Sequence, residues 1–247
     1  ETADMVLTDD NYASIVSAVE QGRIIYSNIR KFVYYLISCN IAEIMIIFLA
    51  ILFNWNTPLA PIQLLWLNLI SDGAPALALG TEKGDPDIME HPPRPASEPI
   101  INKFMVRGII VQTIAITATT LTAFWLGGGA LKGSTAEARI LSETFAFVTL
   151  SLSELFRAYT ARSEYYPLTK IGIFSSKNMN MAVLFSVVLV LLVVYVPFLQ
   201  VIFDTVSLRW IEWAEILPLV LIPTIAAEVM KSISYKKHLK DRAAGKV

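Results

Sequence analysis

Six apolar stretches, each long enough to cross a lipid bilayer, constrain what this chain can fold into. They cover residues 32–53, 59–80, 106–126, 141–159, 181–203 and 212–233, and the fourth is the least apolar. About 20 mostly apolar residues in a helix span the hydrocarbon core, so each stretch qualifies as a transmembrane helix. The composition, 55% hydrophobic and 17% charged, is that of a membrane protein. We therefore predict an all-α, multi-pass integral membrane protein, with the lipid bilayer as its surroundings.

The remaining composition adds less. The net charge of −1 gives no indication of a nucleic-acid partner, and none is expected. The single cysteine, Cys39, excludes an intramolecular disulfide, and its place in the first stretch favours a small packing residue. The chain begins ETADMVLTDD, with no signal-peptide pattern, which suggests a segment of a longer protein.

Basic residues indicate the orientation. If the N-terminal segment is cytoplasmic, the opposite side carries only Lys132, Arg139 and Arg209, and the cytoplasmic side carries the other 17 of the 20 Lys and Arg residues. Short cytoplasmic loops are enriched in these residues. Both termini are therefore predicted to be cytoplasmic.

The first 31 residues differ from the rest. A short apolar run with strand character, at residues 5–7, precedes a turn. From Tyr12 apolar residues recur at roughly helical spacing, and no proline interrupts before Phe53. We predict one helix of about 40 residues, about 60 Å long at 1.5 Å per residue, in which a cytoplasmic stalk (12–31) continues into the first span. The alternative is an amphipathic helix on the membrane surface, bent near Gly22.

Two stretches carry acids at membrane depth. The first contains Asn40 and Glu43, and the second contains Asn68, Ser71 and Asp72 at i, i+3 and i+4. Residues three and four apart share a helix face. A charged side chain at the bilayer centre costs at least ~2.5–3.5 kcal/mol, so intramembrane acids usually mark an ion pathway. If the two faces meet, their oxygens form a cage suited to Ca²⁺, Na⁺ or K⁺. The alternative is a hydrogen-bond network between helices.

Two further features concern this site. Beside Asp72, Gly73 loosens the helix and Pro75 has no N–H for the carbonyl of Ser71, so we expect an interrupted helix of the kind found beside ion sites in transporters.

Glu154 is a third acid at membrane depth, in the fourth stretch. Because Arg157 follows at i+3, Glu154 is either a cation ligand or half of a structural ion pair, and we include it among the candidate ligands.

Three segments resemble P-type cation ATPases. TADMVLTDDNYASIVSAVEQGRIIYSNIRKFVYYLISCNIAEI resembles the end of the phosphorylation domain, the stalk and the fifth transmembrane helix. PIQLLWLNLISDGAPALALG resembles the sixth helix of the calcium-pump branch, and DIMEHPPRPASEPII resembles the loop after it. The resemblance implies three parts, namely a remnant of the phosphorylation domain (1–11), the stalk (12–31) and a transmembrane domain (32–247).

The same resemblance implies a ligand set. The fifth helix of calcium pumps contributes an Asn and a Glu, which match Asn40 and Glu43. The sixth contributes Asn, Thr and Asp, which match Asn68, Ser71 and Asp72 with Ser in place of Thr, and the eighth contributes a Glu, which matches Glu154. Asp72 would be shared by two cation sites, and Asn68 would serve the second.

The function implied is the transport half of an ATP-driven cation pump with Ca²⁺ as the transported ion. The family's DKTGT, TGD, GDGxND and PEGL motifs do not occur in this sequence. ATP and Mg²⁺ would therefore act only through an N-terminal half with actuator, nucleotide-binding and phosphorylation domains. No catalytic residue is assigned, and this chain alone should not hydrolyse ATP. The alternatives are a pump for Mn²⁺, Na⁺ or K⁺, and a non-enzymatic membrane protein.

Overall fold

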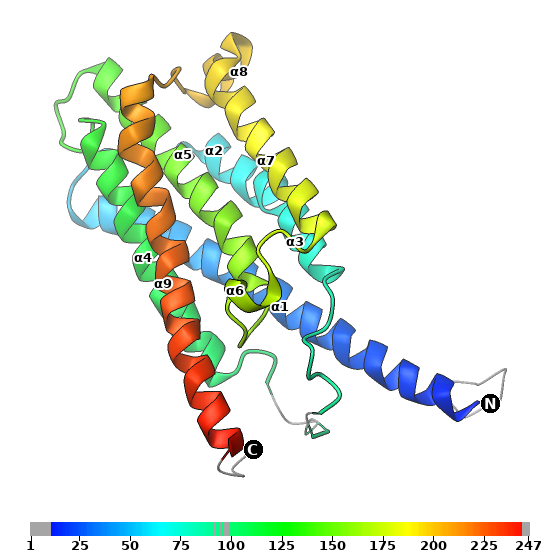
Figure 1. The fold of residues 1–247 in the computed structure, drawn as a ribbon. Coiled ribbons are helices and arrows are strands. Elements are labelled where there is room, and N and C mark those ends of the chain that lie inside the picture. Colours follow the sequence, from blue (N-terminus) through cyan, green and yellow to red (C-terminus); the bar gives the residue numbers. More distant parts are fainter. Residues whose placement is uncertain (1–10, 91, 94, 96–98, 244–247) are drawn as a thin grey trace.

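Helices alone make up the regular structure of the described residues, which confirms the all-α prediction there (Figure 1). The computed structural model describes residues 11–90, 92, 93, 95 and 99–243, with side chains to residue 235. The predicted strand at residues 5–7, and all but the last residue of the predicted domain remnant, lie outside this part of the chain. The helices are α1 (Tyr12–Leu52), α2 (Pro61–Trp66), η1 (Leu67–Ser71), α3 (Gly73–Gly80), α4 (Lys103–Leu126), α5 (Ala136–Ala161), α6 (Leu168–Ile171), α7 (Lys177–Tyr195), α8 (Pro197–Phe203) and α9 (Trp210–Ala243).

Helix α1 runs without interruption for 41 residues. Asn11 caps its start, since the side-chain oxygen accepts a hydrogen bond from the amide of Ala13 at 3.0 Å. The helix continues through Gly22, and Asn28 is its first buried residue. The N-terminal part projects from the bundle, whereas the C-terminal part packs against α3, α4 and α5 (Figure 1).

The second apolar stretch is interrupted where Gly73 and Pro75 predict. A single π-helical segment, η1, separates α2 from α3, and the amide of Asp72 donates to the carbonyl of Leu67 at 2.9 Å. Such one-turn π segments are often found at functional sites. The Ser71 carbonyl, which Pro75 cannot serve, accepts a hydrogen bond from the hydroxyl of Ser186 on α7 at 2.9 Å. The wide turn therefore places Asp72 at the junction of two helical pieces.

Five helices of the described chain, not six, are long and apolar enough to cross a membrane: Tyr12–Leu52, Pro61–Gly80, Lys103–Leu126, Lys177–Tyr195 and Trp210–Tyr235. The predicted span at 141–159 is not among them, so the prediction of six was wrong by one. This stretch lies within α5, whose buried residues include Ser, Thr, Glu and Arg side chains. Because α1, α4, α7 and α9 all pack against α5, its polar side chains are covered by protein, and the sequence need not be strongly apolar.

The fifth predicted span, 181–203, also needs correction. The helix in this stretch, α7, ends at Tyr195, and a separate helix, α8, begins at Pro197. Val196, between them, adopts an extended conformation with φ −88° and ψ 117°. The residue before a proline is disfavoured in the helical region, which explains the break.

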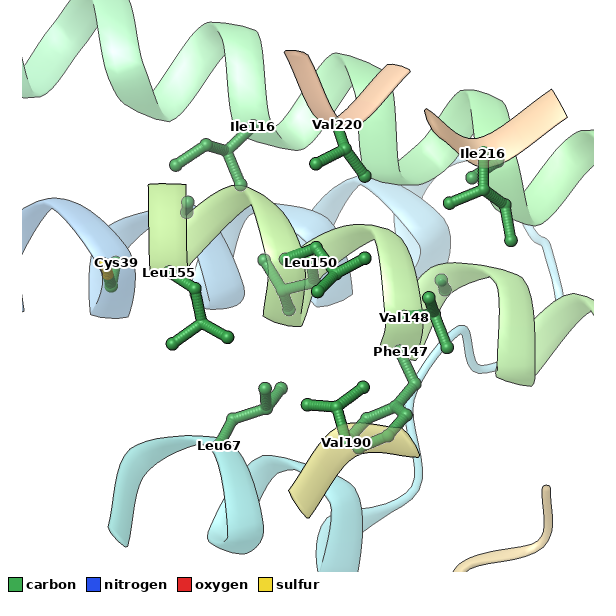
Figure 2. Close-up of a cluster of buried hydrophobic side chains, with 14 of the residues drawn as sticks. Cys39, Leu67, Ile116, Phe147, Val148, Leu150, Leu155, Val190, Ile216 and Val220 are labelled. Carbon is green, nitrogen blue, oxygen red and sulfur yellow. The ribbon is translucent and has the colours of Figure 1, made fainter. Parts of the chain in front are cut away.

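The core is built around α5. Figure 2 shows Phe147 and Leu150 of this helix between Ile116 and Val220 on one side and Leu67 and Val190 on the other, and all belong to one buried cluster. Close packing on both sides fixes the rotation of α5 about its axis. That rotation determines where Glu154 points.

Candidate functional site

The predicted polar faces of α1 and of the interrupted helix lie against each other at Glu43 and Asn68. The amide nitrogen of Asn68 donates to Oε2 of Glu43 at 2.7 Å and to the carbonyl of Leu64 at 3.0 Å. Glu43 is buried, whereas Asn68 is exposed on the outside of the described bundle. The Glu43–Asn68 pair therefore stands at an open face of the bundle.

Asp72 lies deeper and is held from α1. The hydroxyl of Tyr35 donates to Oδ1 of Asp72 at 2.9 Å, and both residues are fully buried. In the described structure Oδ2 of Asp72 has no hydrogen-bond partner, and neither has the hydroxyl of Ser71 beside it. One oxygen of Asp72 is thus fixed in place, while the second remains available.

Glu154 reaches the same region from α5. It is 0% exposed, and within the described residues neither of its carboxylate oxygens has a hydrogen-bond partner. A carboxylate oxygen of Glu154, one of Asp72 and the sulfur of Cys39 all lie within 4.8 Å of one another. Three separate elements therefore bring donor atoms to one point.

Asn40 is less closely associated with the others. Its amide nitrogen donates to the carbonyl of Leu36, one turn earlier on α1, at 2.8 Å, and its side chain is half-buried. This bond satisfies one polar group of Asn40 without contact to the other candidate ligands. The two amides, Asn40 and Asn68, are the most peripheral of the predicted residues.

Sequence reasoning missed two contributors, Tyr35 and Cys39. The sequence favours a packing role for Cys39, and the residue does belong to the buried core. Its sulfur nevertheless lies within 4.8 Å of a carboxylate oxygen of Asp72 and of Glu154, so sulfur as well as oxygen lines this cluster. The signal was the spacing, because Tyr35, Cys39 and Glu43 follow one another at four-residue intervals and share one face of α1.

The polar groups of this cluster are of the kinds that bind cations. Buried oxygens without hydrogen-bond partners, within the described structure, occur at Glu43 Oε1, Ser71 Oγ, Asp72 Oδ2 and both carboxylate oxygens of Glu154. Buried carboxylates without a partner are costly, and such groups in a native protein call for a physical explanation. A bound divalent cation supplies one, since Ca²⁺ takes six to eight oxygen ligands of these kinds.

Known proteins are similar to this chain in sequence. The family model described as "Cation transporting ATPase, C-terminus" matches residues 56–233. Calcium-transporting ATPase 1 of Bacillus cereus is 40% identical over 240 residues, which are 93% of this chain and 27% of that protein. Calcium-transporting ATPase type 2C member 1 of Mus musculus is 36% identical over 245 residues, 99% of this chain and 26% of that protein.

The chain thus spans about a quarter of the length of the curated relatives that it matches. The match covers α2 to most of α9, and the relatives also align with most of α1. The chain belongs to the family of cation-transporting ATPases and corresponds to their C-terminal, membrane part.

Proposed function

We propose that this chain is the ion-binding part of an ATP-driven Ca²⁺ pump. One observation carries the proposal: a carboxylate oxygen of Asp72 and one of Glu154 lie within 4.8 Å of each other, and both buried acids have oxygens without hydrogen-bond partners in the described structure. The relatives named above are calcium-transporting ATPases, which favours Ca²⁺ as the cargo. ATP and Mg²⁺ would be bound by the N-terminal part of the pump, outside this chain.

The proposed ligands fall into two groups. Ser71, Asp72 and Glu154, all buried within the described bundle, would surround the inner position. Glu43 and Asn68 stand at the open face, where helices of the N-terminal half could complete a second position, and Asn40, half-buried on the same helix as Glu43, would be a peripheral ligand. Asp72 would serve both positions because it is the acid at the interruption of the helix. The exposure of Asn68 supports this division, since an exposed amide at membrane depth needs further protein to cover it.

The proposed mechanism runs through α1. With both termini cytoplasmic, the projecting N-terminal part of α1 would be a stalk that enters the membrane as a continuous rod. ATP hydrolysis in the N-terminal half would tilt this rod. Because α1 carries Asn40, Glu43 and Tyr35, a tilt would move two ligands directly and would pull on Asp72 through the 2.9 Å hydrogen bond from Tyr35. Affinity and access at the site would change together.

Phosphorylation of the complete pump tests the proposal. Purified protein that contains this chain is incubated with radiolabelled ATP while Ca²⁺, Mn²⁺, Na⁺ or K⁺ is varied. We expect Ca²⁺ at micromolar levels to give phosphorylated protein, and the double variant Asp72→Asn, Glu154→Gln to remove this dependence. Half-maximal phosphorylation by Mn²⁺ or a monovalent ion at lower concentrations than by Ca²⁺ would assign another cargo. Phosphorylation independent of every cation would contradict the pump.

A further inference from the structure

We propose that Cys39 is a third ligand in the Asp72–Glu154 site, which therefore also takes a thiophilic divalent cation such as Cd²⁺ or Zn²⁺. This inference rests on the proposed function, because it specifies the class of cation that the transport site accepts. Cys39 belongs to α1, Asp72 to the junction of η1 and α3, and Glu154 to α5. Three ligands from three elements would hold one ion at their meeting point.

The geometry allows a shared ion. The sulfur of Cys39 and one carboxylate oxygen each from Asp72 and Glu154 lie within 4.8 Å of one another, and all three residues are at most 1% exposed. Donors at 2.0–2.3 Å from a tetrahedral Zn²⁺ stand about 3.5 Å apart. Small side-chain rotations would bring the three atoms to that separation. Larger ions need even smaller movements.

The two acids also lack another source of positive charge. Arg157 stacks on Tyr34 and donates to the hydroxyl of Thr160, and Lys231, the buried lysine nearby, donates to the carbonyl of Thr160. Neither cation forms an ion pair with Asp72 or Glu154 in the described structure. A thiol is only a weak hydrogen-bond donor and cannot satisfy two carboxylates. In the described part of the chain, therefore, no basic side chain supplies the counter-charge that the ionised acids would need.

Sulfur changes which cation the site prefers. Ca²⁺ is a hard ion and is bound through oxygen, so Cys39 adds little to its affinity. A thiolate favours soft and borderline metals, and a divalent metal that binds a thiol displaces its proton. With the thiolate the site would offer two carboxylates and one sulfur, a donor set suited to Zn²⁺ or Cd²⁺. If Cys39 were only a packing residue, replacing sulfur by oxygen would leave the binding of these ions unchanged.

Cadmium is the probe that reports on sulfur directly. The complete pump, purified in detergent, is titrated with Cd²⁺ while the ultraviolet thiolate-to-cadmium charge-transfer band is recorded. The difference between wild type and Cys39→Ser isolates this thiol from any other cysteine of the whole protein. Ser38→Ala is the matched control, because Ser38 is the buried neighbour whose hydroxyl is already bonded to the Tyr35 carbonyl at 2.8 Å. We expect a difference band for Cys39→Ser and none for Ser38→Ala.

The second part of the experiment replaces the two acids. Asp72→Asn and Glu154→Gln should each weaken the cadmium affinity measured by this band by at least about tenfold, since even supporting residues of metal sites contribute that much. No difference band, or a band whose affinity both variants leave unchanged, would overturn the role of Cys39 in this site.

Calcium separates this inference from the proposed function. We expect Ca²⁺ to suppress the cadmium band in wild type, and the control variant Ser38→Ala to keep Ca²⁺-dependent phosphorylation. Normal Ca²⁺-dependent phosphorylation without any cadmium band would overturn the present inference and leave the calcium pump standing. A different result would support the thiol site and contradict the calcium pump. This result is a strong cadmium band in a protein whose phosphorylation by ATP does not depend on Ca²⁺ and in which Ca²⁺ does not compete with Cd²⁺.

Discussion

Arg157 stacks on Tyr34 of the neighbouring helix, with its guanidinium carbon 4.4 Å from the ring centroid. Its Nη1 donates to the hydroxyl of Thr160 at 2.9 Å. Glu154 lies three residues earlier on the same helix, yet the two side chains form no ion pair in the described structure. A desolvated cation–π contact contributes about 2 kcal/mol and, together with the bond to Thr160, orients the guanidinium toward Tyr34 and Thr160. The geometry thus favours the ligand role of Glu154 over the structural pair that the i+3 spacing also allows.

The first prediction separates these two roles. Glu154→Gln should raise the Ca²⁺ concentration for half-maximal phosphorylation of the complete pump by about tenfold or more, because a ligand charge is lost. Arg157→Ala should leave that concentration nearly unchanged but lower the melting temperature, because the stack on Tyr34 is lost. Both quantities are measured for both variants. Equal destabilisation with an unshifted Ca²⁺ dependence would assign the two residues to a structural pair.

The second prediction concerns the close contact between Tyr34 of α1 and Gly108 of α4. A Cβ atom added to Gly108 of α4 would lie 1.9 Å from the Tyr34 hydroxyl. Gly108→Ala should therefore push Tyr34 aside and destabilise the protein by about 1–3 kcal/mol, as overpacking of a core usually does. The control is Gly22→Ala, because a Cβ there meets nothing within 4 Å. Alanine at this helical position should be neutral or stabilising by about 0.5–1 kcal/mol. Thermal unfolding that is equally affected by both substitutions would contradict the close approach of α1 and α4.

Much of this fold can be read from hydropathy and helix-breaking residues. The long uninterrupted α1 follows from the absence of proline, and the interruption beside Asp72 follows from Gly73 and Pro75. The errors have local causes. Pro197 ends a helix that hydropathy alone would continue, and α5 is too polar to qualify as a span because neighbouring helices, rather than lipid, cover it. Hydropathy reports how favourable it is to transfer a segment into lipid. It does not report whether other helices bury the polar side chains of that segment.

The site was harder to predict than the helices. Spacing along one helix correctly put polar residues on common faces, but it says nothing of which faces meet across the bundle. The rotation of α5, fixed by packing on both sides, decides that Glu154 approaches Cys39 and Asp72. A cysteine in an apolar stretch looks like any other small residue until this partner is known.

The third prediction is that the stability of the folded protein depends on pH through Glu164, at one end of the bundle. Glu164, just beyond α5, accepts hydrogen bonds from Arg30 at 3.0 Å and Asn102 at 2.5 Å. Burial nevertheless raises the pKa of Glu164 above its usual range, with Arg30 and Asn102 acting in the opposite direction. The folded state then holds the proton more tightly than the unfolded state, so the stability that protonation adds is lost as pH rises through the raised pKa.

Thermal unfolding between pH 4 and 8 tests this prediction, since an unfolded glutamate titrates near about 4.3. Glu164→Gln should remove the loss of stability that wild type shows as pH rises in this window. Glu137→Gln is the control, at an exposed acid in the first turn of α5, and should keep the wild-type profile. A profile that Glu164→Gln leaves unchanged, or one in which wild type gains stability with pH through this residue, would contradict the assigned direction.

The last prediction concerns Asp72 itself. Asp72→Asn should abolish Ca²⁺-dependent phosphorylation of the complete pump, because it removes the negative charge and keeps an oxygen that can still accept the bond from Tyr35. Tyr35→Phe is the matched control, since it removes that bond, keeps the charge and costs about 1 kcal/mol, or a few-fold in affinity. Direct Ca²⁺ binding and phosphorylation are measured for both variants. If Asp72→Asn binds Ca²⁺ as wild type does, Asp72 is no ligand. If Tyr35→Phe loses as much as Asp72→Asn, the hydrogen bond rather than the charge makes the site.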